Sequence, residues 1–404
     1  MMRRVFRLLL HLVGSVLLLA AILCGTEVTL RLCESSADDP SSGESLLSTL
    51  TVDSQYTHHQ LKAVQTTQTQ NGDTGASISL KTNSYGLRGA EPTVPKPPGV
   101  FRILCLGDES VLAPETAAAD CFAEQLRNLL QDRWRRPVEV INAGVPGYCP
   151  LLSYLQFKHS LLVLQPDVVI LNFDMSDVAD DYKYRRHTVV DEAGIPIACS
   201  RTVMSNHAQS KTKLIDEFCI GRWCKRKLRD TWLSNDGNDD TPDIANPAFR
   251  YAWISDNPPD WSIYIRQTLS SFDHLKMLCA AVETKLIVAT YPVPWQVSPS
   301  ASSGPGVRES VGVARNAHFV GTAPFQILHQ YCGAHGIAFV DASATFRNAS
   351  EPDSLFLATV PRFSAAGHAV YAELLARFVD AQFNQSIEYY RNQLSERREV
   401  RVIR

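Results

Sequence analysis

The feature that most constrains the fold is an alternation of short apolar segments with amphipathic stretches. Segments with the length and β-branched content of buried strands lie at residues 101–106, 138–141, 167–173, 285–290 and 337–341. Stretches with helical spacing of apolar residues lie at 122–130, 151–164, 272–282, 325–332 and 365–383. Because both faces of such strands are apolar, the pattern predicts an α/β fold with a parallel sheet between two helical layers, a three-layer α/β/α arrangement.

The N-terminus has the pattern of a membrane anchor. Three arginines within the first seven residues precede an apolar run at residues 8–25, in which a histidine is the only strongly polar side chain. This length suits a short membrane span, and no small-residue cleavage site follows it. We therefore expect an uncleaved transmembrane helix within residues 1–33. The arginines place the N-terminus in the cytoplasm and the main domain outside the cell membrane.

The remaining chain divides by composition into four parts. Residues 34–98 are rich in Ser, Thr, Asp and Gln, which predicts a stalk or weakly structured lead-in. The alternating pattern occupies residues 99–383, and a charged tail follows at 384–404. Residues 185–262 interrupt the alternation and are predicted to form an insertion or cap. Within them, residues 188–197 have the pattern of a hairpin that turns at Ala193-Gly194.

Charge and cysteine spacing exclude two classes of function. The formal net charge is -3, so no basic field favours a nucleic-acid partner. The ten cysteines show no metal-ligand spacing, and we predict no metal and no cofactor. A disulfide among Cys199, Cys219 and Cys224 is expected if the domain is exported, without a choice of pair. Other cysteines are expected to be buried thiols, namely Cys105, Cys121, Cys149, Cys279 and Cys332.

Polar residues that could bind a ligand or take part in a reaction lie where the predicted strands end. Gly107-Asp108 follows the first strand, Gly147 follows the second, and the segment from Asp174 to Asp177 follows the third. The carboxyl ends of parallel strands lie at one edge of a sheet, where ligands of such folds bind. We therefore expect these residues to meet at one site.

Four segments in this order resemble the SGNH/GDSL hydrolases, and specifically bacterial membrane-anchored members of that superfamily. The segments are Arg102 to Asp108, Val140 to Tyr148, Asp167 to Leu171 with the loop after it, and Phe363 to His368. The resemblance implies a flavodoxin-like sheet. It also implies a nucleophilic serine after the first Gly-Asp and a base in a closing Asp-x-His. The second glycine of the second segment and an asparagine in the third would hold the oxyanion.

The sequence departs from that pattern at the catalytic positions. Glu109 stands where the resemblance places the serine, and Ser176 stands in place of the asparagine. Val360-Pro361-Arg362 occupies the place of Asp-x-His, while His368 belongs to the start of the last helix. We expect Glu109 and Arg362 to form an ion pair, because burying one charge without the other is costly. A carboxylate beside the retained Gly147 amide would oppose ester hydrolysis.

Two other interpretations of the same edge are open. A register shift by one residue would make Ser110 the nucleophile and His368 the base. Alternatively, the carboxylates at this edge could bind a cation or supply acid/base pairs, namely Asp108, Glu109, Asp174, Asp177, Asp180 and Asp181. Against the second interpretation, Asp108 and Asp177 would cap loops, while Asp180 and Asp181 would face solvent opposite Arg185 and Arg186. Trp295, after the fourth strand, would either line a sugar-binding cleft or simply pack at the rim.

The resemblance implies an ancestral ester chemistry, the hydrolysis of O-acetyl groups on carbohydrate or acylated polysaccharide of the cell envelope. With the altered positions, a non-catalytic relative that binds carbohydrate or assists assembly is equally consistent with the sequence. An exported polysaccharide O-acetyltransferase is a third alternative.

Overall fold

The computed structural model describes residues 25–26, 49–200 and 250–402, with side chains described as far as residue 383. The chain divides into two compact units, residues 1–49 with 202–241 and residues 50–201 with 242–404. Only the second unit is described over most of its length. No helix in the described ranges is long and apolar enough to cross a membrane. The predicted anchor at residues 8–25 lies almost wholly outside those ranges.

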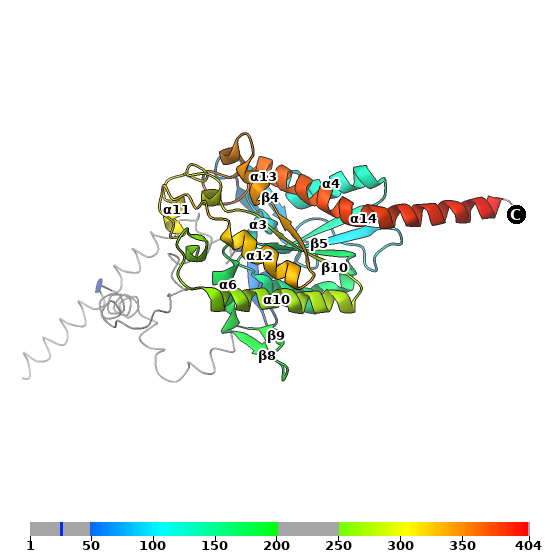
Figure 1. Cartoon of the computed structure of the whole chain (residues 1–404), viewed down its shortest axis with the longest axis horizontal. Helices are drawn as coiled ribbons and strands as arrows, with labels where there is room; N and C mark the ends of the chain where they lie inside the picture. Colours follow the sequence, from blue (N-terminus) through cyan, green and yellow to red (C-terminus); the bar gives the residue numbers. More distant parts are fainter. Residues whose placement is uncertain (1–24, 27–48, 201–249, 403–404) are drawn as a thin grey trace, which may run out of the picture. The chain divides into compact units, whose positions relative to one another are not determined.

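A five-stranded parallel sheet forms the centre of the second unit (Figure 1). Its strands lie in the order β11-β10-β7-β5-β6, which is the 2-1-3-4-5 order of flavodoxin-like sheets. Each corresponds to a predicted strand, and all five predictions are confirmed. The bounds are β5 (Phe101–Gly107), β6 (Val138–Gly144), β7 (Val168–Phe173), β10 (Lys285–Thr290) and β11 (Ala338–Asp341).

Helices cover both faces of this sheet, as the alternating pattern predicts. On one face α4 (Phe122–Trp134) and α14 (Ala365–Val402) pack together, and on the other α5 (Pro150–Gln156) packs with α10 (Ser262–Ala281). The chain after α5 continues as η2 (Phe157–Leu161) and η3 (Leu162–Leu164). The remaining helices are α3 (Glu109–Leu112), η1 (Ala118–Asp120), α6 (Asp177–Arg185), η5 (Ala252–Ile254), η6 (Pro294–Gln296), α11 (Val307–Ser310), α12 (Ala323–Ala334), α13 (Ser343–Arg347) and η7 (Pro352–Leu355).

One hydrophobic core lies between the sheet and the α4–α14 layer. Every residue of β5 and β7 is buried, because each strand is covered on both faces. Leu126 and Leu130 of α4 point into this core. Tyr371 of α14 is wholly buried, and its hydroxyl donates to the Asn172 side chain of β7 at 2.7 Å. The prediction of a helix that ends near residue 383 is wrong in one respect, since α14 continues through the predicted tail to Val402.

The lead-in is not a weakly structured stalk in the part that the structure describes. It forms two antiparallel hairpins, β1 (Thr51–Ser54) with β2 (His58–Leu61) and β3 (Thr66–Gln70) with β4 (Ser77–Lys81). The prediction is wrong because strands of this kind bury only one face, as the alternating burial of β4 shows. A polar strand rich in threonine and glutamine gives little apolar signal.

The predicted hairpin in the insertion is present. β8 (Thr188–Val190) pairs with β9 (Pro196–Cys199) in antiparallel register. Cys199 is a free, buried thiol, so the expectation of a disulfide that includes it is wrong. Cys219 and Cys224 lie outside the described residues. The five cysteines predicted to be buried thiols are free and buried, as expected.

Candidate functional site

The turn after β5 brings the backbone of two loops into close contact. Gly107 has a φ of +152°, and a Cβ there would lie 2.5 Å from a methyl group of Val111. A Cβ on Gly144, at the end of β6, would lie 2.3 Å from the Leu112 nitrogen. Asp108 is buried and accepts a hydrogen bond from the Ser110 N–H at 2.8 Å, which caps α3. Glycine at two strand ends therefore lets α3 start directly beside the loop after β6.

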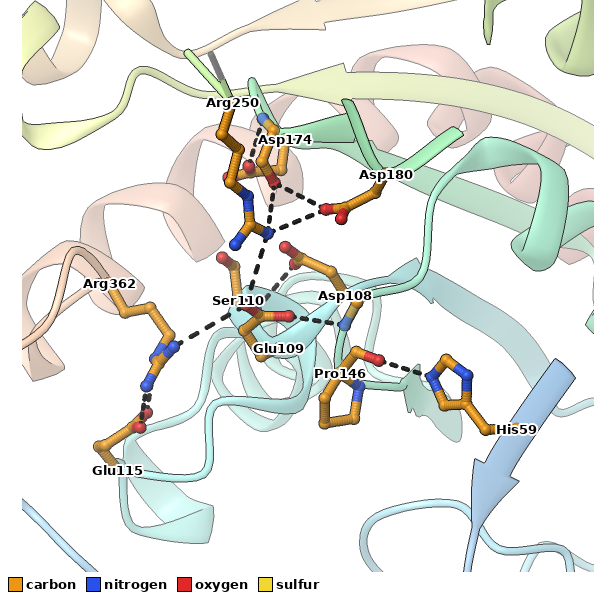
Figure 2. A network of polar contacts seen from close by, with 12 residues as sticks. His59, Asp108, Glu109, Ser110, Glu115, Pro146, Asp174, Asp180, Arg250 and Arg362 are labelled. Carbon is orange, nitrogen blue, oxygen red and sulfur yellow. Dashed lines mark hydrogen bonds and ion pairs between the residues drawn. The ribbon is translucent and has the colours of Figure 1, made fainter. Parts of the chain in front are cut away.

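The first residue of α3 directs its carboxylate at that loop. Glu109 Oε2 accepts a hydrogen bond from the Gly147 N–H at 2.8 Å (Figure 2). Gly147 has a φ of +70°, in the left-handed region that glycine adopts without strain. The expected proximity of Glu109 to the Gly147 amide is therefore present.

Arg362 contacts two carboxylates. Its Nη1 lies 3.9 Å from Glu109 Oε1, so the expected ion pair is formed at long range. Its stronger partner is Glu115, which accepts from Arg362 Nε at 2.9 Å and also from Nη2. This bidentate pair fixes the plane of the guanidinium group. Sequence reasoning missed Glu115, because nothing in the segment after α3 distinguishes it from an ordinary loop carboxylate.

A second arginine, Arg250, approaches Glu109 from the far side of the site. Its Nη2 lies 2.9 Å from Asp180 Oδ2 and 3.1 Å from Ser176 Oγ, and 4.0 Å from Glu109 Oε1 (Figure 2). Arg250 belongs to the segment predicted to be an insertion, so no strand-end pattern points to it. Ser176, which stands in place of the expected asparagine, is therefore hydrogen-bonded to a cation.

The aspartates of the loop after β7 are buried. Asp174 accepts from the backbone N–H two residues further on at 2.7 Å, and Asp177 accepts from the Asp174 N–H at 3.0 Å. These capping bonds agree with the simpler interpretation of the cluster. The expectation that Asp180 and Asp181 face solvent is wrong, since both are buried. Asp181 pairs with Arg185 as expected, whereas the partner of Asp180 is Arg250. Among residues 49–200 and 250–383, no group of His, Cys, Asp and Glu is arranged to hold a metal ion.

Two adjacent carboxyl groups have pKa values shifted in opposite directions. Burial raises the pKa of Asp108 well above its usual range, and the Glu109 and Asp174 carboxylates add to the effect. Burial also acts to raise the pKa of Glu109, but Arg250, Arg362 and the Gly147 N–H outweigh it and lower the pKa. Glu109 therefore carries the negative charge, while Asp108 keeps its proton to higher pH.

Ser110 and His368 do not form a nucleophile–base pair. Among the described residues no hydrogen bond joins them, and the His368 Nδ1 is buried without a hydrogen-bond partner. The imidazole is only 2% exposed and packs against the rings of Phe122 and Phe363. Burial and, to a lesser extent, the Arg88 charge lower the pKa of His368 to about 3. This histidine is a core residue and not a general base.

Trp295 is wholly buried, so it does not line an exposed cleft. Its ring packs edge-on against Tyr251 with the ring centroids 4.7 Å apart. The sugar-stacking interpretation is therefore wrong, and ordinary packing accounts for this residue.

The β3–β4 hairpin holds the two loops that bring Arg362 to its partner. Asn71 donates to the Glu115 carbonyl oxygen at 3.0 Å. Asp73 accepts from the backbone N–H groups of Ala358 at 2.8 Å and Thr359 at 3.0 Å. The lead-in thus supports the site directly, which its composition did not predict.

The segments that carry the sequence resemblance meet at one edge of the sheet. Glu109 after β5, Gly147 after β6 and Ser176 after β7 lie together with Arg362, which precedes α14. The sheet order is the one that this resemblance implies. The fold is SGNH/GDSL hydrolase-like.

Solved structures of low sequence identity are similar to this chain. No family model matches the chain, and no curated protein matches it. Among solved structures, a lipase/acylhydrolase from Enterococcus faecalis has a TM-score of 0.36 at 14% identity and covers 70% of this chain and 96% of its own. A catalytic mutant of Axe2, an acetylxylan esterase from Geobacillus stearothermophilus, has a TM-score of 0.37 at 13% identity and covers 69% and 94%. The SGNH/GDSL-like assignment depends on sheet order and loop positions, not on these values.

Proposed function

We propose that this protein binds carbohydrate through an SGNH/GDSL hydrolase-like site that does not hydrolyse esters. In this proposal Glu109 and Arg362 take the places of the nucleophilic serine and the basic histidine. One observation carries it, the 2.8 Å hydrogen bond from the Gly147 N–H to the Glu109 carboxylate. The donor that an esterase of this type would offer to the oxyanion is occupied by a fixed negative charge.

The charge of Glu109 opposes the transition state of ester hydrolysis. Acyl transfer places a negative charge on the substrate oxygen, close to the Gly147 N–H. Two like charges about 4 Å apart near a protein surface repel each other by about 4 kcal/mol. A penalty of this size slows a reaction about a thousandfold. The site also lacks a hydroxyl–imidazole pair among its described residues, because His368 is turned into the core.

The same side chains suit a ligand with many hydroxyl groups. The Glu109, Arg250 and Arg362 side chains are 20%, 29% and 15% exposed, so each is partly accessible. Carboxylate and guanidinium groups are planar and can each form two parallel hydrogen bonds. Vicinal sugar hydroxyls offer such a pair of partners. Because Arg250 and Arg362 are already paired with carboxylates of the site, an uncharged saccharide is favoured over a strongly charged ligand.

Two assays on the full chain test this proposal. In the first, we expect no hydrolysis of p-nitrophenyl acetate above the rate without protein. In the second, we expect binding on a glycan array that weakens at least about tenfold in Glu109→Gln. One lost hydrogen bond to a charged group is worth about 1.5–3 kcal/mol, which corresponds to a weakening of that size. Glu124→Gln, a change in a surface carboxylate of α4 away from the site, is the matched control. Turnover that disappears in Ser110→Ala would contradict the proposal and favour an esterase or acetyltransferase.

We further propose that the protein is anchored in the cell membrane by the apolar run at residues 8–25, with its main domain on the extracytoplasmic side. The basic N-terminus and the length of the run support this orientation. A C-terminal alkaline phosphatase fusion should be active in a bacterial host, because that enzyme requires export. Loss of the three N-terminal arginines should reduce this activity. An inactive fusion would contradict the orientation.

A further inference from the structure

One peptide group in the site is held at both of its ends. The peptide between Pro146 and Gly147 donates its N–H to Glu109 Oε2 at 2.8 Å. Its carbonyl oxygen, on the opposite side of the same plane, lies 2.8 Å from His59 Nε2 (Figure 2). Because the peptide is planar and trans, the direction of the carbonyl fixes the direction of the N–H. A contact that holds the carbonyl oxygen of this peptide therefore also fixes the direction of its N–H.

This peptide is the one that a turn of this kind can reverse. The Tyr148 N–H donates to the Val145 carbonyl oxygen at 3.1 Å, so residues 145–148 form a β-turn. Proline at its second position and a glycine with a φ of +70° at its third are the signature of a type II turn. Type I and type II turns differ by reversal of the central peptide, and glycine is at ease in either. The turn sequence therefore favours the observed direction of the Gly147 N–H, but it leaves the reversed peptide accessible.

We propose that His59 is a positioning residue that holds the Pro146–Gly147 peptide with its N–H directed into the site. Reversal of the peptide would turn the Pro146 carbonyl oxygen toward the Glu109 carboxylate. The contact between His59 Nε2 and that carbonyl oxygen opposes the reversal. The inference goes beyond carbohydrate binding, since it concerns which group the site presents to any ligand.

His59 is itself placed with little freedom. It is fully buried on β2, and its backbone carbonyl oxygen accepts from the Tyr148 hydroxyl at 2.6 Å. Its Nδ1 lies 3.0 Å from His58 Nδ1. Because Nε2 faces a carbonyl oxygen, it must carry a proton. In a neutral ring Nδ1 is then an acceptor, which requires the proton of this contact to be on His58 Nδ1. The contact with the Pro146 carbonyl oxygen thus places a proton on Nε2, and the contacts at both ring nitrogens fix the ring orientation.

The titration of Glu109 reports the orientation of the peptide directly. With the N–H facing it the carboxylate is stabilised, and with a carbonyl oxygen facing it the carboxylate is destabilised. The measurement is the pKa of Glu109 in the full chain, from the ¹³C resonance of its carboxyl carbon, assigned with Glu109→Gln. We expect His59→Asn, whose amide is too short to reach Pro146, to raise this pKa by about one unit. We expect His59→Gln, whose amide reaches as far as Nε2, to restore it.

His159→Asn is the matched control, because it removes another histidine contact to a backbone carbonyl oxygen, that of Ile197 at 2.7 Å, outside the turn, and it should leave the Glu109 pKa unchanged. Equal shifts in His59→Asn and His59→Gln would reduce His59 to a packing role and overturn the proposal, as would no shift in either. If the variants do not fold, the ¹⁵N spectrum of the unaltered chain decides, since an unprotonated Nε2 on His59 is incompatible with the proposal. None of these readouts depends on a ligand or on turnover, so they can fail while carbohydrate binding stands.

Discussion

The two ends of β5 both carry charged side chains, but they use them differently. At the amino end Arg102 is wholly buried, and its Nε donates to Glu139 at 2.7 Å. Its remaining N–H groups donate to the carbonyl oxygens of Leu164 at 2.5 Å and Thr93 at 2.8 Å. At the carboxyl end Glu109 lies about 4 Å from two arginines and is partly exposed.

This difference indicates that Arg102 has a structural role, whereas the charged residues around Glu109 form a functional site. Each guanidinium nitrogen of Arg102 donates a hydrogen bond, and two of the acceptors are backbone carbonyl oxygens. The side chain therefore connects loops at the base of the sheet. At the other edge several carboxyl groups are buried together, and burial raises the pKa values of Asp108 and Asp177. Among them Glu109 keeps its charge against its own desolvation cost, as is usual for sites that bind or react. The carboxyl edge of the sheet is also where ligands bind in such folds.

The largest effect is expected at the amino end. Arg102→Leu should lower the free energy of unfolding by about 3 kcal/mol, because it leaves two buried carbonyl oxygens without donors and Glu139 without its partner. Urea unfolding followed by circular dichroism measures this. Arg127→Leu, which breaks the exposed ion pair with Glu124, should cost less than about 1 kcal/mol. Equal losses of unfolding free energy in Arg102→Leu and Arg127→Leu would contradict a structural role of Arg102 at the amino end of β5.

The buried His368, which lies in the core beside the site, should make the stability of the protein depend on pH. Its pKa is lowered from 6.5 to about 3 by burial in the folded state, so the unfolded chain binds the proton more tightly. Stability should therefore fall as the pH drops from 6.5 toward 3, by about 1.4 kcal/mol per pH unit from this group, or about 2 kcal/mol at pH 5. His368→Leu should remove that part of the slope, as measured by urea unfolding at a series of pH values. Above pH 7 the slopes of the two proteins should coincide.

At the carboxyl end, removing a buried charge should stabilise the protein. Burial, with the Asp108, Asp174 and Asp180 carboxylates, raises the pKa of Asp177. The folded protein therefore holds this proton more tightly than the unfolded chain, and stability falls as the pH rises from about 3.9 through the folded pKa. Asp177→Asn keeps an acceptor for the Asp174 N–H and should raise the free energy of unfolding at pH 7 by about 1–2 kcal/mol. A thermal melt at pH 7 and pH 3 checks it, with no gain expected at pH 3. A loss at pH 7 would show that the charge is structural.

The smallest effect on stability is expected at Glu109. Its pKa is lowered by Arg250 and Arg362 against burial, so the charge contributes stability above pH about 4.3 that is lost as the pH falls through the folded pKa. Because the three groups are partly exposed, Glu109→Gln should cost less than about 1 kcal/mol at pH 7. Calorimetry at pH 7 measures this, and the glycan array measures the larger expected loss of binding. A stability loss as large as that of Arg102→Leu would make Glu109 structural as well.

The sequence by itself determined the sheet. Strands such as β5 and β7 are apolar on both faces, and that pattern is local, so each could be located without knowledge of its neighbours. The order of the strand-end motifs then placed Glu109, Gly147 and Ser176 at one edge, since parallel strands end together. The proximity of Glu109 to the Gly147 amide and to Arg362 followed from that placement.

Only the tertiary structure decided which partners these groups have. Glu115, Arg250 and His59 reach the site from a loop, from the far end of the insertion and from the lead-in, and none of those segments has an apolar period that fixes its place. Their positions depend on single long-range hydrogen bonds and ion pairs, which leave no periodic trace in the sequence. Burial likewise separated Trp295 and His368 from the site, because exposure depends on what packs over a side chain and not on its type.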